Sequence, residues 1–280
     1  MHHTLATPTP ARMPTSHTAH AIFIEGPDAI AFAHSQFTSQ VTALANQRWQ
    51  FSSWLDAQGR VRNMFHLARI SDERLLVILR GGDATSFIEN LRRFVFRSRV
   101  KLSNAEGLLA NSSATPLHDV DMQDDAIRLG CGTHSVLFGE NVQNDDAWQL
   151  QQLREGWAWL PSNTLNELLP PALSLHRLGA VAIDKGCYPG QEIVARLHYR
   201  GGNKRHLHHV ALSKHAQEGA LLQRDHREFM RLLNLFIVDN EHIEALAVMT
   251  DEAAEQFGQQ HEHLLSDDGI DIRLLTSWPA

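Results

Sequence analysis

Cysteine is scarce in this chain, because Cys131 and Cys187 are its only two thiols among 280 residues. Two thiols are too few for a framework of disulfide bonds and too few for a zinc site built from cysteines. Free thiols without a disulfide framework suit the reducing cytoplasm, which is where we expect the protein to act.

Long apolar runs and an excess of positive charge are also missing. No stretch approaches the roughly 20 apolar residues that a membrane-spanning helix requires. The N-terminus has no basic region followed by an apolar run, so we expect neither a secretion signal nor a membrane partner. The net charge of −7 argues against non-specific wrapping of nucleic acid. A hydrophobic content of 43% supports a substantial core.

Histidine, by contrast, is abundant, with 18 residues scattered along the chain and no H-E-x-x-H motif. His206 and His208 would share one face of a strand. That arrangement can bind a metal ion, but it more often belongs to a solvated strand face. The sequence therefore predicts no metal site.

The most informative stretch is the octapeptide Lys185–Glu192, which has the sequence KGCYPGQE. Its proline fixes a φ angle and its glycines permit unusual ones, so we predict a tight, rigid loop that presents Cys187. Thiols react as thiolates, and the nearby cations Lys185 and Arg196 would favour that form. The alternative is a buried structural cysteine. Residues 193–196 suggest a strand or the start of another ordered element.

The same octapeptide resembles the K-G-C-Y-x-G-Q-E signature of the YgfZ family, relatives of the glycine-cleavage T-protein, an aminomethyltransferase. The resemblance implies an α+β fold of the T-protein type, with ferredoxin-like halves and a small C-terminal β-barrel. It also implies binding of tetrahydrofolate or a derivative. Members of the family support the assembly or repair of iron–sulfur enzymes, including one that thiomethylates tRNA. The signature cysteine, here Cys187, is the functional residue of the family.

Further matches extend the resemblance over residues 20–205. Trp148 stands upstream of Cys187 at the spacing of a family tryptophan that contributes to the folate site. An indole face suits stacking on a pterin ring. The basic turn at 200–205, RGGNKR, matches as well.

Other positions depart from the family pattern. Gln40 stands where an acidic residue is usual, and Pro171 and Ser174 replace a polar pair. The second family tryptophan, near the N-terminus, has no counterpart at Ala19 or His20. Recognition of the folate should therefore be altered in this chain.

A second cationic stretch, 91–100, has the sequence LRRFVFRSRV. With a period of two, Arg93, Arg97 and Arg99 would share one face of a strand. Such a face can meet a folate glutamate tail or RNA phosphates, or it can be solvated or paired with acids. Charge and resemblance together assign these residues to folate binding: Trp148, Arg93, Arg97, Arg196 and Gln191. They assign Cys187 and Lys185 to the chemistry.

Hydrophobic patterns and turn residues outline the remaining elements. We predict a helix at 29–36 capped by Asp28, a later helix capped by Asp83, and a hairpin turn at 56–59. The predicted strands are 21–24, 47–55, 61–70, 75–79, 136–138, 232–238, 243–249 and 270–275, and 251–263 is more helical than a barrel requires. The expected organisation is a disordered arm at 1–18, a folate-binding core at 19–205 and a divergent barrel-like domain at 206–280.

Three functional hypotheses follow. The first is a folate-binding accessory protein for iron–sulfur enzymes, more an accessory factor than a turnover enzyme, in which Cys187 handles redox chemistry or a cluster. The second is a folate-dependent aminomethyl or one-carbon transferase like the T-protein, although that enzyme has a different sequence at the position of Cys187. The third is a non-catalytic module that holds tRNA or a protein on its basic face.

Overall fold

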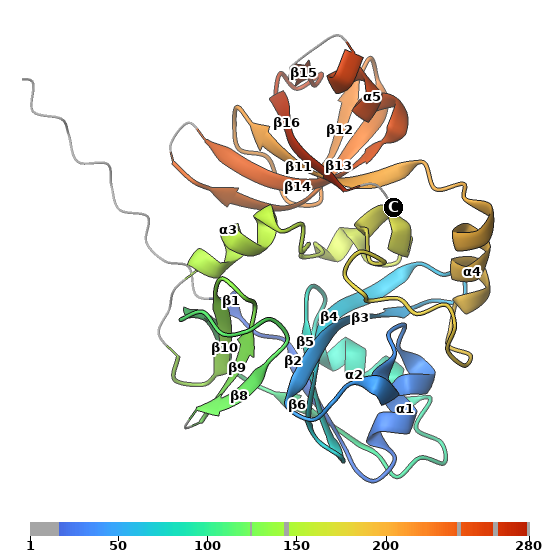
Figure 1. Cartoon of the computed structure of the whole chain (residues 1–280). Coiled ribbons are helices and arrows are strands. Elements are labelled where there is room, and N and C mark those ends of the chain that lie inside the picture. Colours follow the sequence, from blue (N-terminus) through green and yellow to red (C-terminus); the bar gives the residue numbers. More distant parts are fainter. Residues whose placement is uncertain (1–16, 124, 143–145, 240–241, 260–262, 279–280) are drawn as a thin grey trace, which may run out of the picture.

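The computed structural model describes residues 17–123, 125–142, 146–239, 242–259 and 263–278. Its strands form three antiparallel sheets, and its α-helices are few and short (Figure 1). The α+β class predicted from the sequence is confirmed. The predicted arm at 1–18 lies outside the described residues except for its last two, which form strand β1 (His17–Thr18).

The first sheet comes from the N-terminal part of the chain and has the strand order β3-β4-β5-β2-β6. Helices α1 (Ala29–Gln36) and α2 (Ala84–Arg92) pack on one of its faces. Strand residues alternate between the faces, so Ile22 and Ile24 join the core with these helices while Ala21 joins the opposite core. The strands are β2 (Ala21–Glu25), β3 (Arg48–Leu55), β4 (Val61–Ser71), β5 (Arg74–Leu79) and β6 (Lys101–Ala105).

The second sheet has the order β1-β7-β10-β9-β8. Its strands after β1 are β7 (Leu108–Ser112), β8 (Val120–Gln123), β9 (Ala126–Gly130) and β10 (Ser135–Gly139). The chain then forms α3 (Ala147–Arg154) and two 3₁₀ turns, η2 (Ser162–Thr164) and η3 (Pro170–Leu173).

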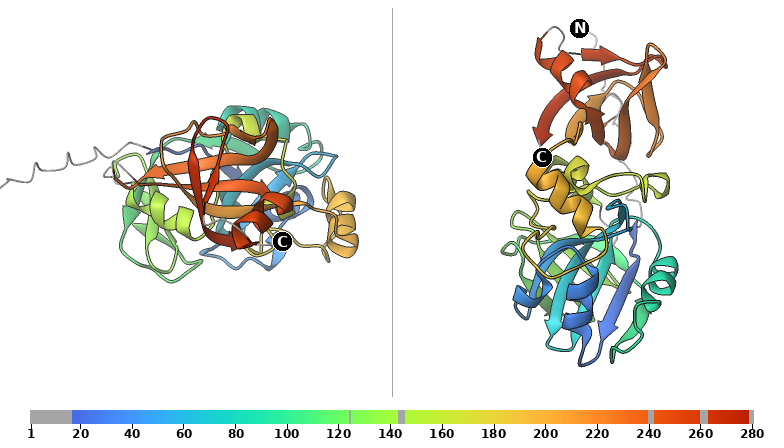
Figure 2. Two further views of the ribbon diagram at one scale, coloured as in Figure 1. Left: turned by 90° about the horizontal axis from the view of Figure 1, so that it is seen from above. Right: turned by 90° about the vertical axis from the view of Figure 1, so that its right-hand side faces the viewer.

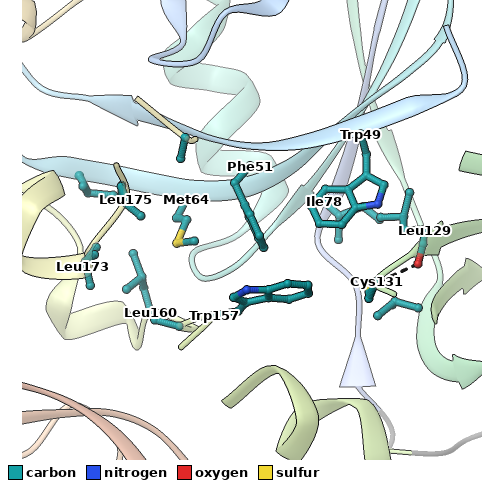
Figure 3. Close-up of a cluster of buried hydrophobic side chains, with 14 of the residues drawn as sticks. Trp49, Phe51, Met64, Ile78, Leu129, Cys131, Trp157, Leu160, Leu173 and Leu175 are labelled. Carbon is teal, nitrogen blue, oxygen red and sulfur yellow. Dashed lines mark hydrogen bonds between the residues drawn. The ribbon is translucent and has the colours of Figure 1, made fainter. Parts of the chain in front are cut away.

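A central core joins these parts. Side chains from both sheets and from the segment 157–180 form one buried cluster (Figure 3). Trp49, Phe51 and Trp157 meet in it with ring centroids 5.0 to 6.1 Å apart. Cys131 belongs to this cluster, and burial raises the pKa of its thiol to about 12. Cys131 is therefore a structural residue, as its lack of any surrounding motif suggests.

The third sheet is the predicted C-terminal barrel, a six-stranded sheet in the order β12-β13-β14-β11-β16-β15 with its own core. It stacks on the rest of the molecule (Figure 2). Its elements are β11 (Arg205–Leu212), β12 (Leu221–Arg224), β13 (Arg227–Ile237), β14 (Ile243–Thr250), α5 (Asp251–Gln259), β15 (His263–Leu265) and β16 (Asp271–Trp278). The three strands predicted here are confirmed. The helical character predicted for 251–263 is confirmed for 251–259, whereas His263 begins a strand and residues 260–262 lie outside the described ranges.

Of the two alternatives predicted for residues 193–196, the strand is wrong and the other ordered element is correct. These residues lie in helix α4 (Gln191–Arg200), which follows Gly190. Gly190 adopts a φ of +78°, and its α-carbon packs so closely on Asp56 that a side chain there would clash. The helix also has Glu192 in its first turn and Arg200 in its last, which suits the helix dipole.

The arginine run at 91–100 is not a strand either. Helix α2 ends at Arg92, and the following residues form a turn-rich loop whose Val95 and Val100 pack against the core. The predicted cap of α1 is also wrong, because the Asp28 carboxylate instead accepts hydrogen bonds from Arg99 at 2.7 to 3.2 Å. The Asp83 cap of α2 is confirmed, with its carboxylate accepting the Ser86 N–H at 2.8 Å.

No helix in the described ranges has both the length and the apolar character that a membrane crossing requires.

Candidate functional site

Trp148 lies inside an aromatic cluster rather than at the edge of a loop. It is the second residue of α3 and is fully buried. Its ring centroid lies 5.5 Å from that of Trp159 and 5.3 Å from that of His17, and His17 lies 4.6 Å from Trp159. The three rings come from β1, α3 and the segment after α3, so this cluster depends on the tertiary fold.

These three aromatic residues line a cavity of about 230 Å³ between α3 and strand β13, which we name the Trp148 pocket. Its other lining residues are Gln149, Leu153, Leu160, Pro161, Glu218, Asn234, Leu235 and Phe236. Glu218 is exposed and accepts the Leu235 N–H at 3.0 Å, so it marks the opening of the pocket. The pocket therefore has aromatic and aliphatic walls with amide and carboxylate groups among them.

Two buried hydrogen-bond donors belong to the walls of this pocket. The indole nitrogens of Trp148 and Trp159 have no hydrogen-bond partner among the described residues. A buried indole N–H usually has a partner, and leaving one without costs free energy. Burial also lowers the pKa of His17 to about 4, so this wall is uncharged at neutral pH. The pocket is thus suited to a flat, uncharged ring that carries hydrogen-bond acceptors.

A charged network fixes α3 above the third sheet. Buried Glu244 of β14 accepts two hydrogen bonds from Arg154 at the end of α3, at 2.5 and 2.9 Å. The same carboxylate contacts His209 of β11 at 2.8 Å. Burial alone would raise the pKa of Glu244, but the hydrogen bonds and the positive charge of Arg154 lower it to about 2. Because Trp148 and Arg154 lie on one short helix, this network also positions the pocket.

A second network supports the opposite wall. The guanidinium of Arg80, the residue that follows β5, is fully buried. It donates to the carbonyls of Ala158 and Trp157 and to Oε1 of Gln152, at 2.5 to 2.9 Å. Its guanidinium carbon also lies 4.6 Å from the ring centroid of Trp159. Arg80 therefore joins the first sheet to α3 and to a pocket residue.

The octapeptide forms the predicted rigid loop, and Cys187 is exposed at its surface. Lys185 and Tyr188 on either side are buried. The Tyr188 hydroxyl donates to the Ala182 carbonyl at 3.0 Å, and the Gln191 amide donates to the Lys185 carbonyl at 3.0 Å. The alternative of a buried structural cysteine is wrong for Cys187, because its thiol is exposed and not in a disulfide. The buried side chains of Lys185 and Tyr188 anchor the loop instead.

Lys185 is one of those anchors. Its ammonium donates to the carbonyls of His34, Phe37 and Ser39 at 2.5 to 2.9 Å, which satisfies the C-terminal end of α1. Burial lowers the pKa of Lys185 to about 8, so it remains largely protonated at neutral pH. The lysine thus attaches the Cys187 loop to the first sheet, and its effect on the thiolate stays a prediction.

Replacing Lys185 with Met is expected to lower the free energy of unfolding by about 3 kcal/mol, because three buried carbonyls lose their donor. Urea denaturation followed by circular dichroism measures this change. The exposed Lys204→Met is the matched control and should change stability by less than about 0.5 kcal/mol. Equal stability of the two variants would show that Lys185 is not an anchor.

The remaining predicted ligand residues lie away from the Trp148 pocket. Arg93 and Arg97 are exposed on the loop after α2, and Arg196 is exposed on α4. Gln191 begins α4 and contacts the Cys187 loop. None of the four is among the residues that line the pocket. Their role in folate binding stays a prediction.

Sequence reasoning missed several residues of the site. Trp159, His17 and Glu218 line the pocket, but none follows a motif that would single it out. Arg80 is missed because arginine is rarely buried. Its burial is explained only by the hydrogen-bond acceptors that the fold places around its guanidinium. For the histidines, no group of described residues has metal-binding geometry, and His206 contacts Asp251 at 2.6 Å.

No family model matches the chain. An uncharacterized protein of Haemophilus influenzae is 28% identical over 195 residues, which cover 66% of this chain and 68% of the relative. A tRNA-modifying protein YgfZ of Vibrio atlanticus is 25% identical over 216 residues, covering 68% and 67%. A protein of that name from Aliivibrio fischeri is 25% identical over 262 residues, covering 82% of both chains.

Among solved structures, the glycine cleavage system aminomethyltransferase T of Bartonella henselae has the same fold. The comparison gives a TM-score of 0.64 at 12% sequence identity, over 93% of this chain and 83% of that chain. Identity this low shows the fold alone, and it confirms the T-protein-like fold expected from the octapeptide. Together, the KGCYPGQE signature, the relatives named YgfZ and this fold support the resemblance of the chain to the YgfZ family.

Proposed function

We propose that this protein binds a reduced folate in the Trp148 pocket and acts through Cys187 in support of iron–sulfur enzymes that modify tRNA. The observation that carries the proposal is the pocket itself. Two tryptophans and a neutral histidine surround it, and both indole N–H groups are buried without a partner among the described residues.

The residues present fit a pterin ring. A pterin is flat and aromatic, so it can stack on an indole face. Its ring nitrogens and carbonyl oxygen accept hydrogen bonds, which the Trp148 and Trp159 N–H groups can donate. Its amino group and ring N–H can donate to Glu218 at the pocket opening or to Gln149. When bound, a reduced folate would supply a carrier for a one-carbon unit.

The pocket also accounts for one departure from the family pattern. The chain lacks the N-terminal tryptophan at Ala19 and His20. Here Trp159 and His17 provide aromatic surface beside Trp148. We infer that folate recognition depends on Trp159 in this chain.

Cys187 supplies the second part of the proposal. Its loop is attached at Lys185, Tyr188 and Gln191 while the thiol itself is exposed. A thiol held in this way can meet a client protein. One cysteine cannot hold a cluster that needs four ligands, so any cluster would be shared with that client. Relatives of this chain are named tRNA-modifying proteins, and this name is the reason to propose that the clients act on tRNA.

Replacing Trp159 with Phe is expected to weaken tetrahydrofolate binding about fivefold to tenfold, because the ring remains but its N–H donor is lost. Isothermal titration measures the dissociation constant. Trp54→Phe is the matched control, since the Trp54 indole nitrogen is also buried with no partner in the described part of the chain, but Trp54 does not line this pocket. The proposal fails if both variants bind tetrahydrofolate as the unaltered protein does.

The role of Cys187 is tested separately with Cys187→Ser in a strain that lacks the gene. We expect the serine variant to leave the activity of tRNA-modifying iron–sulfur enzymes unrestored while still binding tetrahydrofolate. Full restoration would mean that the thiol has no function. Turnover of an aminomethyl donor by the purified protein would instead favour the transferase hypothesis.

A further inference from the structure

The loop between α2 and β6 exposes aromatic rings beside unpaired cations. Phe96 is 86% exposed, the largest exposure among the large hydrophobic residues described, and Phe94 is 45% exposed. Arg92, Arg93 and Arg97 are exposed around them. The guanidinium of Arg97 lies 5.8 Å from the ring centroid of Phe96. We name the last residue of α2 and the loop that follows it, residues 92–99, the RFVFR loop.

The arginines of this loop lack acidic partners. Within the described part of the chain, Arg92, Arg93 and Arg97 form no ion pair, whereas Arg99 pairs with Asp28. The chain as a whole carries a net charge of −7, so this cluster is a local exception to an acidic molecule. Unpaired guanidiniums at one place favour an anionic partner.

Both ends of the loop are anchored to the rest of the molecule. At its start, the N–H groups of Phe94 and Val95 donate to the carbonyls of Leu91 and Arg92, both at 3.0 Å. At its end, Arg99 is fixed by three hydrogen bonds to Asp28. A β-carbon at Gly26 would lie only 2.2 Å from the Arg99 carbonyl oxygen, so the chain there packs directly on the turn before α1. Phe96 and Arg97 are thus presented from a fixed base.

We propose that the RFVFR loop binds single-stranded RNA, with bases stacked on Phe96 and Phe94 and phosphates held by Arg93 and Arg97. The inference rests on the proposed role in tRNA modification and deepens it, since it places the RNA in direct contact with this protein. Exposed aromatic rings interleaved with arginines are the combination that binds single strands, because each base offers a flat face and each nucleotide a phosphate.

An acidic protein segment is the competing partner for such a loop. It would need the arginines but would gain little from a ring as exposed as that of Phe96. The ring is therefore the feature that favours RNA. The two partners differ in whether binding depends on Phe96 or on charge alone.

Fluorescence anisotropy with a labelled 12-nucleotide oligouridine tests the inference. Phe96→Ala is expected to weaken binding about tenfold, which is the effect of losing one stacked base. Arg93→Ala with Arg97→Ala should weaken binding and reduce the salt dependence by roughly 1.4 in the slope of log K against log salt, the loss of about two phosphate contacts. Tyr199→Ala is the matched control, because Tyr199 is 76% exposed on α4, and it should bind as the unaltered protein does.

The inference is overturned if the unaltered protein does not bind the oligouridine or if Phe96→Ala binds it equally well. It is also overturned if a polyglutamate peptide displaces the RNA and binds independently of Phe96, which would identify an acidic protein partner. Titrating the same variants with tetrahydrofolate separates this inference from the proposed function. We expect the loop variants to keep their folate affinity, because no loop residue lines the Trp148 pocket.

Discussion

Acidification from pH 6.5 to pH 4 is expected to remove about 6 kcal/mol of folding free energy, which is of the order of the stability of a whole domain. Burial lowers the pKa of His17, His134 and His208 from 6.5 to about 4. Each pKa unit corresponds to about 1.4 kcal/mol, and solvent screening reduces the contribution of each histidine to about 2 kcal/mol.

The direction follows from proton binding. Between pH 4 and 6.5 these histidines bind protons in the unfolded chain but stay neutral in the folded one. The unfolded state therefore gains protons on acidification, and stability falls as the pH decreases through this window. Burial also holds the pKa of His66 well below its usual value, which adds to the effect. The buried histidines therefore make the folding stability of this protein sensitive to acid.

Urea denaturation at pH 7 and pH 4.5 measures this loss. His208→Asn should reduce the difference between the two pH values by about 2 kcal/mol, because one neutral buried imidazole is gone. His226→Asn is the matched control, since the His226 side chain is 97% exposed. Equal free energies of unfolding at both pH values would contradict the prediction.

Replacing Arg80 with Met is expected to lower the free energy of unfolding by about 3 kcal/mol at pH 7. Three buried acceptors, the carbonyls of Trp157 and Ala158 and the Gln152 side chain, would lose their donor. Removing a charge from the interior offsets part of that cost, because the acceptors of this guanidinium are uncharged and burial lowers its pKa to about 9. The Trp159 wall should loosen as well, and tetrahydrofolate binding should weaken.

Thermal and urea denaturation of Arg80→Met measure the change in stability. The exposed Arg227→Met serves as the control and should behave as the unaltered protein. A variant at Arg80 as stable as this control would mean that the buried guanidinium contributes nothing net to the fold.

Local elements of the fold were predictable because their signals are local. The helix at 29–36 and the hairpin turn at 56–59 depend on a few adjacent residues, and the structure places both where they were expected. The rigid loop around Cys187 was also predictable from its proline and glycines. Elements whose signals compete were not. Ile193 and Val194 favour a strand locally, yet the turn at Gly190 begins a helix.

The pocket could not be predicted beyond Trp148. Trp159, His17 and Glu218 come from distant parts of the chain, and only the tertiary fold brings them together around the pocket. The partners of charged side chains also could not be predicted from the sequence. Lys185 is close to Cys187 in sequence, but its ammonium donates to carbonyls at the end of α1. Asp28 is a residue type that often caps helices, but its carboxylate binds Arg99 instead of the N–H groups of α1.

Titration of the purified protein with tetrahydrofolate in an isothermal calorimeter tests the central claim most directly. We predict saturable binding of one folate per chain, weakened when Trp159 is replaced by Phe and unchanged when Trp54 is. Absence of binding by the unaltered protein would contradict the account of the Trp148 pocket and would leave the Cys187 loop as the functional element of this chain.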